Sequence, residues 1–139
     1  MKKVILNKCF GGFGASYLAH KLYAKKKYNI DEIFVYEWSK NGYVKICLDA
    51  NDRSFRFYSI KDFGDFIAHE DRDKIKDSFL FLDEDKREDP IFIEVVEKLG
   101  EKANTRFSDL KIVEIPDDLD YVIDDYDGVE TLHQKVQEW

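Results

Sequence analysis

The residues with the clearest chemical potential form one glycine-rich segment near the N-terminus. Residues 7–16 read Asn-Lys-Cys-Phe-Gly-Gly-Phe-Gly-Ala-Ser and lie between an apolar run and a segment of helical periodicity. A turn of this kind presents backbone N–H groups beside the start of a helix, which suits a phosphate or a carboxylate. The segment lacks the Gly-Lys-Ser/Thr of a P-loop and the spacing of the dinucleotide-binding motif. A tight turn that only lets the helix pack closely on the strand is therefore the open alternative.

A second segment is expected to complete a ligand site with this turn. Tyr126, Asp127 and Glu130 offer an aromatic ring and two carboxylates, which can stack on and hydrogen-bond a base or a ribose. A turn whose tyrosine packs on the core is the alternative. Lys8, Arg87 or Arg106 is expected near the anion. The predicted ligand-binding residues are Asn7, Lys8, Phe10, Gly11, Gly12, Phe13, Gly14, Tyr126, Asp127 and Glu130.

A catalytic or metal site is not apparent in the sequence. Cys9 lies between Lys8 and a predicted helix start, and both neighbours favour the reactive thiolate. A cysteine nucleophile also needs a base, and the sequence pairs none of the three histidines with it, so we favour a structural thiol. The aspartates of residues 124–127 do not have calcium-loop spacing, and no His/Cys cluster suits zinc. We therefore expect no catalytic set, no metal and no cofactor.

The glycine-rich turn needs a strand before it and a helix after it. We expect the strand to be interior and hydrogen-bonded on both sides, because its apolar run is continuous. The helix should begin with Gly14 or Ser16 as its N-cap. The elements expected in the first part of the chain are a strand at 3–9, a helix at 15–28, strands at 33–38 and 43–48 joined by an Asn-Gly hairpin turn, and a further strand at 53–58.

The second part of the chain contains one strongly marked helix. Asp89-Pro90 is typical of a helix start, and Phe92, Val95, Val96 and Leu99 form an apolar stripe behind it. The other expected elements are a short helix after the capping-box-like 59–62, a segment at 72–82 that suits helix or strand, a charged loop at 83–88, strands at 110–115 and 121–126 paired as a hairpin, and a short terminal helix from 129. The whole predicts a single α+β domain over 1–139, with a mixed or antiparallel sheet and helices mainly on one side.

Composition limits the classes of partner. The chain has 139 residues, of which 44% are hydrophobic and 15% aromatic, enough for a packed core. The net charge of −7 argues against binding to duplex nucleic acid or to an anionic membrane. The two cysteines form no C-x-x-C pair, and no apolar run is long enough for a signal peptide or a membrane span. We expect a cytoplasmic protein.

The two ends of the chain resemble a known family. Asn7-Lys8-Cys9-Phe10-Gly11-Gly12-Phe13 is similar to the opening motif of a widespread family of small, mostly uncharacterised phage and prophage proteins. Roughly residues 29–88 fall outside the resemblance. Further similar segments are Asp89-Pro90, residues 95–103, residues 111–118, the stretch Tyr126-Asp127-Gly128-Val129-Glu130, and Trp139.

The resemblance implies a phage accessory protein in the cytoplasm of a bacterial host. Small phage proteins of this sort often counter host defence. The first hypothesis is therefore a binding protein, most simply a C2 homodimer, that sequesters a small anionic, nucleotide-derived molecule. The glycine turn would hold the phosphate, and aromatic residues would hold the base. The alternatives are a protein–protein inhibitor of a host enzyme and, third, a hydrolase of a nucleotide signal.

Overall fold

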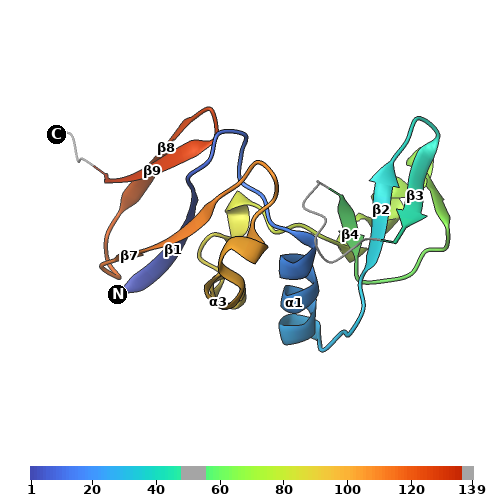
Figure 1. Ribbon diagram of the computed structural model, residues 1–139, viewed down its shortest axis with the longest axis horizontal. Helices are drawn as coiled ribbons and strands as arrows, with labels where there is room; N and C mark the ends of the chain where they lie inside the picture. The colour runs from blue at the N-terminus through green and yellow to red at the C-terminus, as the bar shows by residue number, and fades with distance from the viewer. Residues whose placement is uncertain (48–55, 136–139) are drawn as a thin grey trace.

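The fold combines antiparallel strands with two packed helices (Figure 1). The computed structural model describes residues 1–47 and 56–135. The strands are β1 Lys2–Asn7, β2 Phe34–Trp38, β3 Gly42–Ile46, β4 Phe57–Ser59, β5 Phe66–Ala68, β6 Phe79–Leu80, β7 Leu110–Ile115, β8 Tyr121–Tyr126 and β9 Val129–Gln134. The helices are α1 Tyr17–Tyr28, α2 Arg72–Ile75 and α3 Pro90–Leu99, with 3-10 turns η1 His69–Asp71, η2 Lys76–Ser78, η3 Glu84–Lys86 and η4 Gly100–Ala103. The predicted α+β class is confirmed.

Strand β1 belongs to a two-stranded sheet with β7, so it is not an interior strand. It pairs antiparallel with β7 over its whole length, from Lys2 opposite Ile115 to Asn7 opposite Leu110. In the described part of the chain no strand pairs with its other edge, so the prediction of strand pairing on both sides is wrong. The N–H of Ile5 instead donates to the backbone oxygen of Arg87 at 2.9 Å, and the N–H of Asn7 donates to the Glu130 carboxylate at 2.8 Å.

The two faces of this sheet explain why β1 is apolar throughout. Ile5 lies in the main core with residues of α1 and α3, among them Ala19 and Phe92. Val4 and Leu6 point to the opposite face and pack with residues of the β8–β9 hairpin. Both faces are therefore covered, and burial rather than a central sheet position accounts for the continuous run. Helices α1 and α3 lie on one side of this sheet, as predicted, whereas Ile75 of α2 packs with the other sheet.

The C-terminal segment forms a hairpin instead of the predicted short helix. Strands β8 and β9 pair from Tyr121 opposite Gln134 to Tyr126 opposite Val129. Their turn is Asp127-Gly128, with φ angles of 50° and 93°, and an Asp-Gly pair suits a two-residue hairpin turn with positive φ. The predicted hairpin between 110–115 and 121–126 is likewise wrong, because the first of these strands pairs with β1 and the second with β9.

The second sheet has five strands in the order β5-β3-β2-β4-β6, all antiparallel. The predicted hairpin of β2 and β3 is confirmed, while residue 48 and residues 53–55 of the predicted strands lie outside the described ranges. The helix expected after 59–62 is wrong: Ser59 ends β4 and bonds to Lys61, and Phe66–Ala68 form β5. The ambiguous segment 72–82 contains both α2 and β6.

Helix α3 begins at the predicted Pro90, whereas α1 begins at Tyr17, two residues after the predicted start, with Ser16 as the correct one of its two candidate caps. Ser16 caps α1 by accepting the N–H of Ala19 at 3.2 Å, and Asp89 caps α3 by accepting the N–H of Ile91 at 2.9 Å. The Tyr23 hydroxyl of α1 donates to the same Asp89 carboxylate at 2.5 Å. This bond joins the middle of α1 to the start of α3, so the helices that support the glycine-rich segment are fixed to each other.

Candidate binding surface at the glycine loop

The glycine-rich segment and the β8–β9 turn meet, as the sequence led us to expect. The N–H of Gly11 donates to the backbone oxygen of Asp127 at 2.9 Å. A Cβ atom on Gly128 would lie 2.5 Å from the backbone nitrogen of Gly12, so the two backbones are in direct contact. The turn of β8–β9 therefore packs on the glycine loop, which we define as residues 8–15.

The glycines of the loop differ in what surrounds them. Gly11 has a φ of 130°, and a Cβ on it would lie 2.6 Å from the Cβ of Phe107. Gly11 is exposed to solvent, but its Cβ direction is blocked by Phe107 and its N–H is bonded to the hairpin turn, so a side chain has no room there. Gly12 has a φ of 134°, yet a Cβ on it would meet no atom within 4 Å. Gly12 is half-buried, but a side chain placed there would extend into open space.

Asn7 and Glu130, both predicted to touch a ligand, are buried and hold the loop to the hairpin. The Asn7 amide donates to the backbone oxygen atoms of Cys9 at 2.9 Å and Gly128 at 2.6 Å. Its side-chain oxygen accepts the N–H of Asp109 at 2.8 Å. Asn7 has no exposed surface, so it is a positioning residue in this structure.

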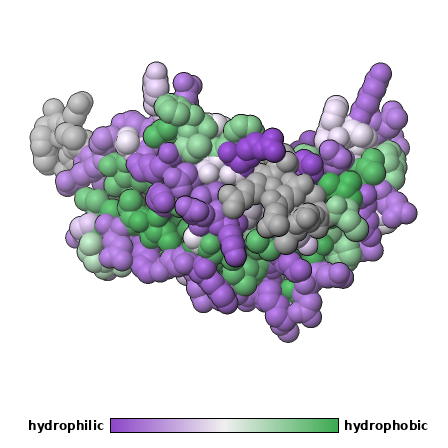
Figure 2. Space-filling view, in the orientation of Figure 1, coloured by the Kyte–Doolittle hydropathy of each residue, from purple (hydrophilic) through white to green (hydrophobic). Residues whose placement is uncertain are grey.

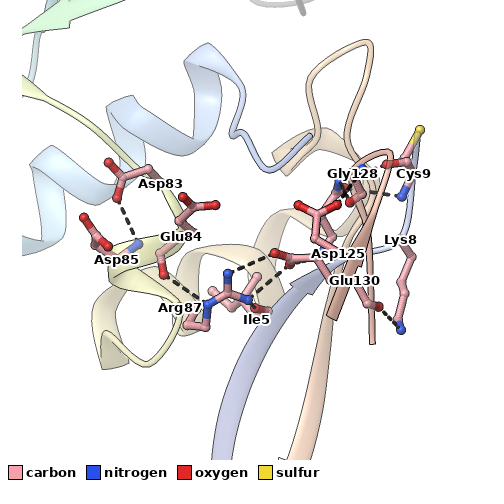
Figure 3. Close-up of polar contacts among 11 residues, drawn as sticks. Ile5, Lys8, Cys9, Asp83, Glu84, Asp85, Arg87, Asp125, Gly128 and Glu130 are labelled. Atoms are coloured by element: carbon pink, nitrogen blue, oxygen red, sulfur yellow. Dashed lines mark hydrogen bonds and ion pairs between the residues drawn. The ribbon is translucent and has the colours of Figure 1, made fainter. Parts of the chain in front are cut away.

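Glu130 forms a buried ion pair with Arg87 (Figure 3). The guanidinium of Arg87 donates through Nη1 and Nη2 to the two carboxylate oxygens, at 3.1 and 3.0 Å. Nη1 also donates to the backbone oxygen of Ile5 at 3.1 Å. The Glu130 side chain is 3% exposed, and the ammonium group of Lys8 donates to the Glu130 backbone oxygen. Of the predicted cations, Arg87 is therefore engaged in a buried ion pair, while Lys8 is an exposed residue whose ammonium group bonds to the hairpin backbone.

Three aromatic side chains around the loop remain exposed to solvent. Phe10 is 64% exposed, Phe107 62% and Tyr126 75%. We call these three residues the aromatic rim. Figure 2 shows hydrophobic residues reaching the surface along the upper edge of the molecule, above the glycine loop and the β8–β9 turn. The sequence interpretation missed Phe107; the only signal was a phenylalanine within the polar loop Thr105–Ser108 that precedes β7.

Phe13 and Gly14 line a small cavity. Its other walls include His20 and Tyr58, and its volume is about 70 Å³. Phe13 packs edge-on against Phe92, with the Arg87 guanidinium 5.2 Å above its ring. Pockets for drug-sized ligands measure about 300–1,000 Å³, so this cavity is too small for a nucleotide.

The N-terminus of α1 is covered, contrary to the picture of a helix end open to an anion. Ala15 and Ser16 are 6% and 3% exposed. The N–H of Ser16 donates to the backbone oxygen of Ala103 at 2.9 Å, and its hydroxyl donates to that of Lys102 at 2.5 Å. The η4 turn thus lies over the first turn of the helix. An anion would reach the loop backbone near Gly12 rather than the helix end.

The histidines bond elsewhere than to Cys9. His20 is buried, and its Nδ1 lies 2.8 Å from the backbone oxygen of Ser16. Burial lowers the pKa of His20 to about 4. His69 Nε2 lies 2.7 Å from the backbone oxygen of Ser39, and His133 pairs with Asp124. Cys9 Sγ contacts the backbone oxygen of Phe10, so no Cys–His pair is formed within residues 1–47 and 56–135.

A metal cluster and a membrane-spanning helix are both absent from the described ranges. There, no group of three or more His, Cys, Asp or Glu side chains is arranged to hold a metal ion. Nor does that part of the chain contain a helix with the length and hydrophobicity needed to span a bilayer.

Comparison with known proteins returned no relative. No family model, no curated protein and no solved structure matches the chain. The resemblance to small phage proteins therefore remains a hypothesis, and the function has to be argued from the surface just described.

Proposed function

We propose that this protein is a non-catalytic binding module whose recognition surface is the aromatic rim around the glycine loop. One observation carries the proposal: Phe10, Phe107 and Tyr126 are each more than 60% exposed and come from three segments that meet at one point. Large aromatic side chains are enriched at interfaces and among the residues that contribute most to binding energy. Three of them in solvent around one loop are better explained by a partner than by the stability of the monomer.

The backbone beneath the rim is held rigidly. The buried contacts of Asn7 with Cys9, Gly128 and Asp109, together with the Arg87–Glu130 pair, fix the loop and the hairpin turn to β1. A recognition surface that is ordered before binding loses less conformational entropy when a partner binds. This arrangement supports a protein partner, and the phage resemblance makes a host enzyme or defence protein the proposed target.

A nucleotide-derived anion is the second candidate ligand. The observation in its favour is the open space at Gly12, where the loop backbone is accessible beside the exposed ring of Phe10. A phosphate bound to loop N–H groups and a base stacked on an aromatic ring would use both features. In this version of the proposal Asn7 and Glu130 position the loop and do not touch the ligand.

The two candidates are separated by substitutions at different residues. Wild-type protein and a Phe10→Ser/Phe107→Ser/Tyr126→Ser variant are immobilised, and bacterial proteins retained from a lysate are compared by mass spectrometry. Phe81→Ser, an exposed aromatic outside the rim, is the matched control. We expect a specific protein to be retained by the wild type and the control and lost with the triple variant. Identical retained proteins in all three samples would contradict the protein-partner proposal.

The nucleotide candidate is tested by calorimetry with a panel of mono- and dinucleotides. Gly12→Val places side-chain atoms beside the loop at a φ of 134° that strains a valine, so it should abolish binding by filling or rearranging the loop, with circular dichroism as the check on the overall fold. Equal affinity of wild type and Gly12→Val, or the absence of binding to any member of the panel, counts against this candidate.

A further inference from the structure

A groove between α1 and α3 forms a second feature that the proposed function does not use. Its volume is about 430 Å³, and its apolar wall consists of Leu18, Leu22 and Leu99. Lys21, Lys25 and Lys98 lie around this wall, with Asp31. The groove is thus apolar inside and basic along its edge. The contrast with the chain's net charge of −7 marks it as a local exception on an acidic protein.

The positive charge of the groove is only partly neutralised within the molecule. Lys25 pairs with Asp31 at 2.6 Å, and the neighbouring Lys26 pairs with Glu94 at 2.9 Å. Among the residues that the structure describes, Lys21 and Lys98 have no carboxylate partner within ion-pair distance. Two ammonium groups beside apolar side chains favour an occupant that presents negative charge next to an apolar or aromatic anchor.

The β8–β9 turn has this chemistry. Tyr126 is 75% exposed, and the side chains of Asp124, Asp125 and Asp127 around it are exposed as well. Tyr126 pairs across the hairpin with Val129, on the face opposite to Ile123 and Leu132, which pack on β1 and β7. An aromatic anchor surrounded by carboxylates is complementary to an apolar groove surrounded by lysines.

The turn does not reach the groove of its own chain. In Figure 1 the β8–β9 turn lies at the upper edge of the molecule, beside the start of the glycine loop, whereas α1 and α3 run through its lower half. Any occupancy of the groove by this turn therefore involves a second copy of the protein.

We propose that the protein self-associates head to tail, with Tyr126 of one copy inserted in the α1–α3 groove of the next. The acidic turn residues face Lys21 and Lys98, and the tyrosine ring packs against Leu18, Leu22 and Leu99. This inference rests on the proposed function, because it names a second copy as one partner of the aromatic rim. The contact is heterologous, so repetition gives a closed ring or an open chain and not the C2 dimer expected from the sequence.

The test uses two variants that each lack one half of the contact. Tyr126→Ser removes the anchor, and Lys21→Glu/Lys98→Glu reverses the free charges of the groove; Lys61→Glu/Lys76→Glu, on exposed lysines of the other sheet region, is the control with the same charge change. Sedimentation velocity is measured from low to high micromolar concentration. We expect wild type and control to associate, and each half-variant to associate at least about tenfold more weakly.

Mixing the half-variants gives the decisive result. The Tyr126→Ser protein keeps an intact groove and the Lys21→Glu/Lys98→Glu protein keeps an intact turn, so a head-to-tail contact predicts a 1:1 complex that does not grow beyond two chains. Association should also weaken between about 50 mM and 500 mM salt, because the charges are exposed. A mixture that stays monomeric, or a wild type that is monomeric at every concentration, overturns the inference.

The proposed function can fail separately from this inference. A monomeric wild type that still retains a foreign protein through its aromatic rim would overturn self-association alone. If the protein self-associates but retains no foreign protein through its aromatic rim, the proposal of a foreign partner is contradicted. The second copy of the chain then remains the partner of the rim.

Discussion

Removal of one member of the Arg87–Glu130 pair should be one of the most destabilising single changes in the protein. Arg87→Met keeps much of the aliphatic length of the side chain and removes the guanidinium. The Glu130 carboxylate then remains 3% exposed, with the N–H of Asn7 as its remaining hydrogen-bond donor among the described residues. A buried charge that loses its partner typically costs about 3–5 kcal/mol.

The number of hydrogen bonds that Arg87 makes places the expected loss of stability in the upper part of the range of about 3–5 kcal/mol. Its guanidinium makes two hydrogen bonds to the carboxylate and one to the Ile5 backbone oxygen, and hydrogen bonds to charged groups contribute about 1.5–3 kcal/mol each. The Ile5 oxygen lies on the unpaired edge of β1, so its loss adds to the cost. We expect a loss of about 4 kcal/mol in the free energy of unfolding.

The double variant Arg87→Met/Glu130→Gln tests the physical reason. Glutamine can still accept the N–H of Asn7, and no unpaired charge is buried. The double variant should therefore lose less stability than the sum of the two single variants, with a coupling energy of about 1–3 kcal/mol. The exposed pair of Lys3 and Glu97, 39% and 46% exposed, is the control: Lys3→Met should cost under about 1 kcal/mol.

Urea unfolding followed by circular dichroism measures these differences, with the denaturant slope checked for constancy across the variants. A loss below about 1 kcal/mol for Arg87→Met would refute the account, because it would equate the buried pair with the surface pair. Strict additivity of the two single variants would refute it as well, since the cost would then not arise from an unpaired charge.

The remaining predictions concern packing, pH and the thiol. Gly128→Ala should cost about 2 kcal/mol or more, because a Cβ there lies 2.5 Å from the Gly12 nitrogen at a φ of 93°; a urea midpoint equal to wild type would show that the loop contact is dispensable. Because burial lowers the pKa of His20 from 6.5 to about 4, the unfolded chain binds the proton first as the pH falls, and stability should decrease by about 2 kcal/mol between pH 7 and pH 5. The His20→Phe variant should lose less over the same interval, and equal slopes in urea titrations would contradict this. Val96→Asp should cost several kcal/mol, because Val96 is 5% exposed in the core; an unchanged melting temperature would exclude that placement. Cys9→Ser should retain partner binding with wild-type stability, and loss of binding in a folded Cys9→Ser protein would revive a chemical role for the thiol.

The sequence predicted elements whose signals are local and failed where pairing is between distant segments. The caps of α1 and α3 lie directly before the helices they start, and the start of α3 was predicted correctly, while that of α1 was predicted two residues early. The ranges 110–115 and 121–126 also match β7 and β8. The pairing partners of these two strands were not predicted. Strand β7 pairs with β1, which is far away in the sequence, whereas the turn at Pro116 made a local hairpin the simpler expectation.

The terminal hairpin shows how two patterns can compete. Val129, Leu132 and His133 have helical spacing, but Glu130 and Leu132 also alternate inward along a strand. The Asp-Gly turn before them was the deciding local signal, and the helical interpretation passed over it. For the site, the meeting of the glycine loop with residues 126–128 was anticipated. The burial of Asn7 and Glu130 was not anticipated. A polar residue is expected to be exposed unless a buried partner is known, and for Glu130 that partner is Arg87.

The sequence positions of the partners of β1 have a consequence for folding during synthesis. Strand β1 is synthesised before its hydrogen-bonding partners, which are Arg87, β7 and Glu130, and the last of these contacts spans 123 residues. At a synthesis rate of about 5–20 residues per second, that separation corresponds to roughly 6–25 seconds. Until β7 is synthesised, the nascent chain carries an unpaired apolar strand, the kind of segment that aggregates or binds a chaperone. Completion of the N-terminal half of the core is thus coupled to the arrival of the C-terminal hairpin, so a prematurely terminated chain lacks the contacts that would bury its own first strand.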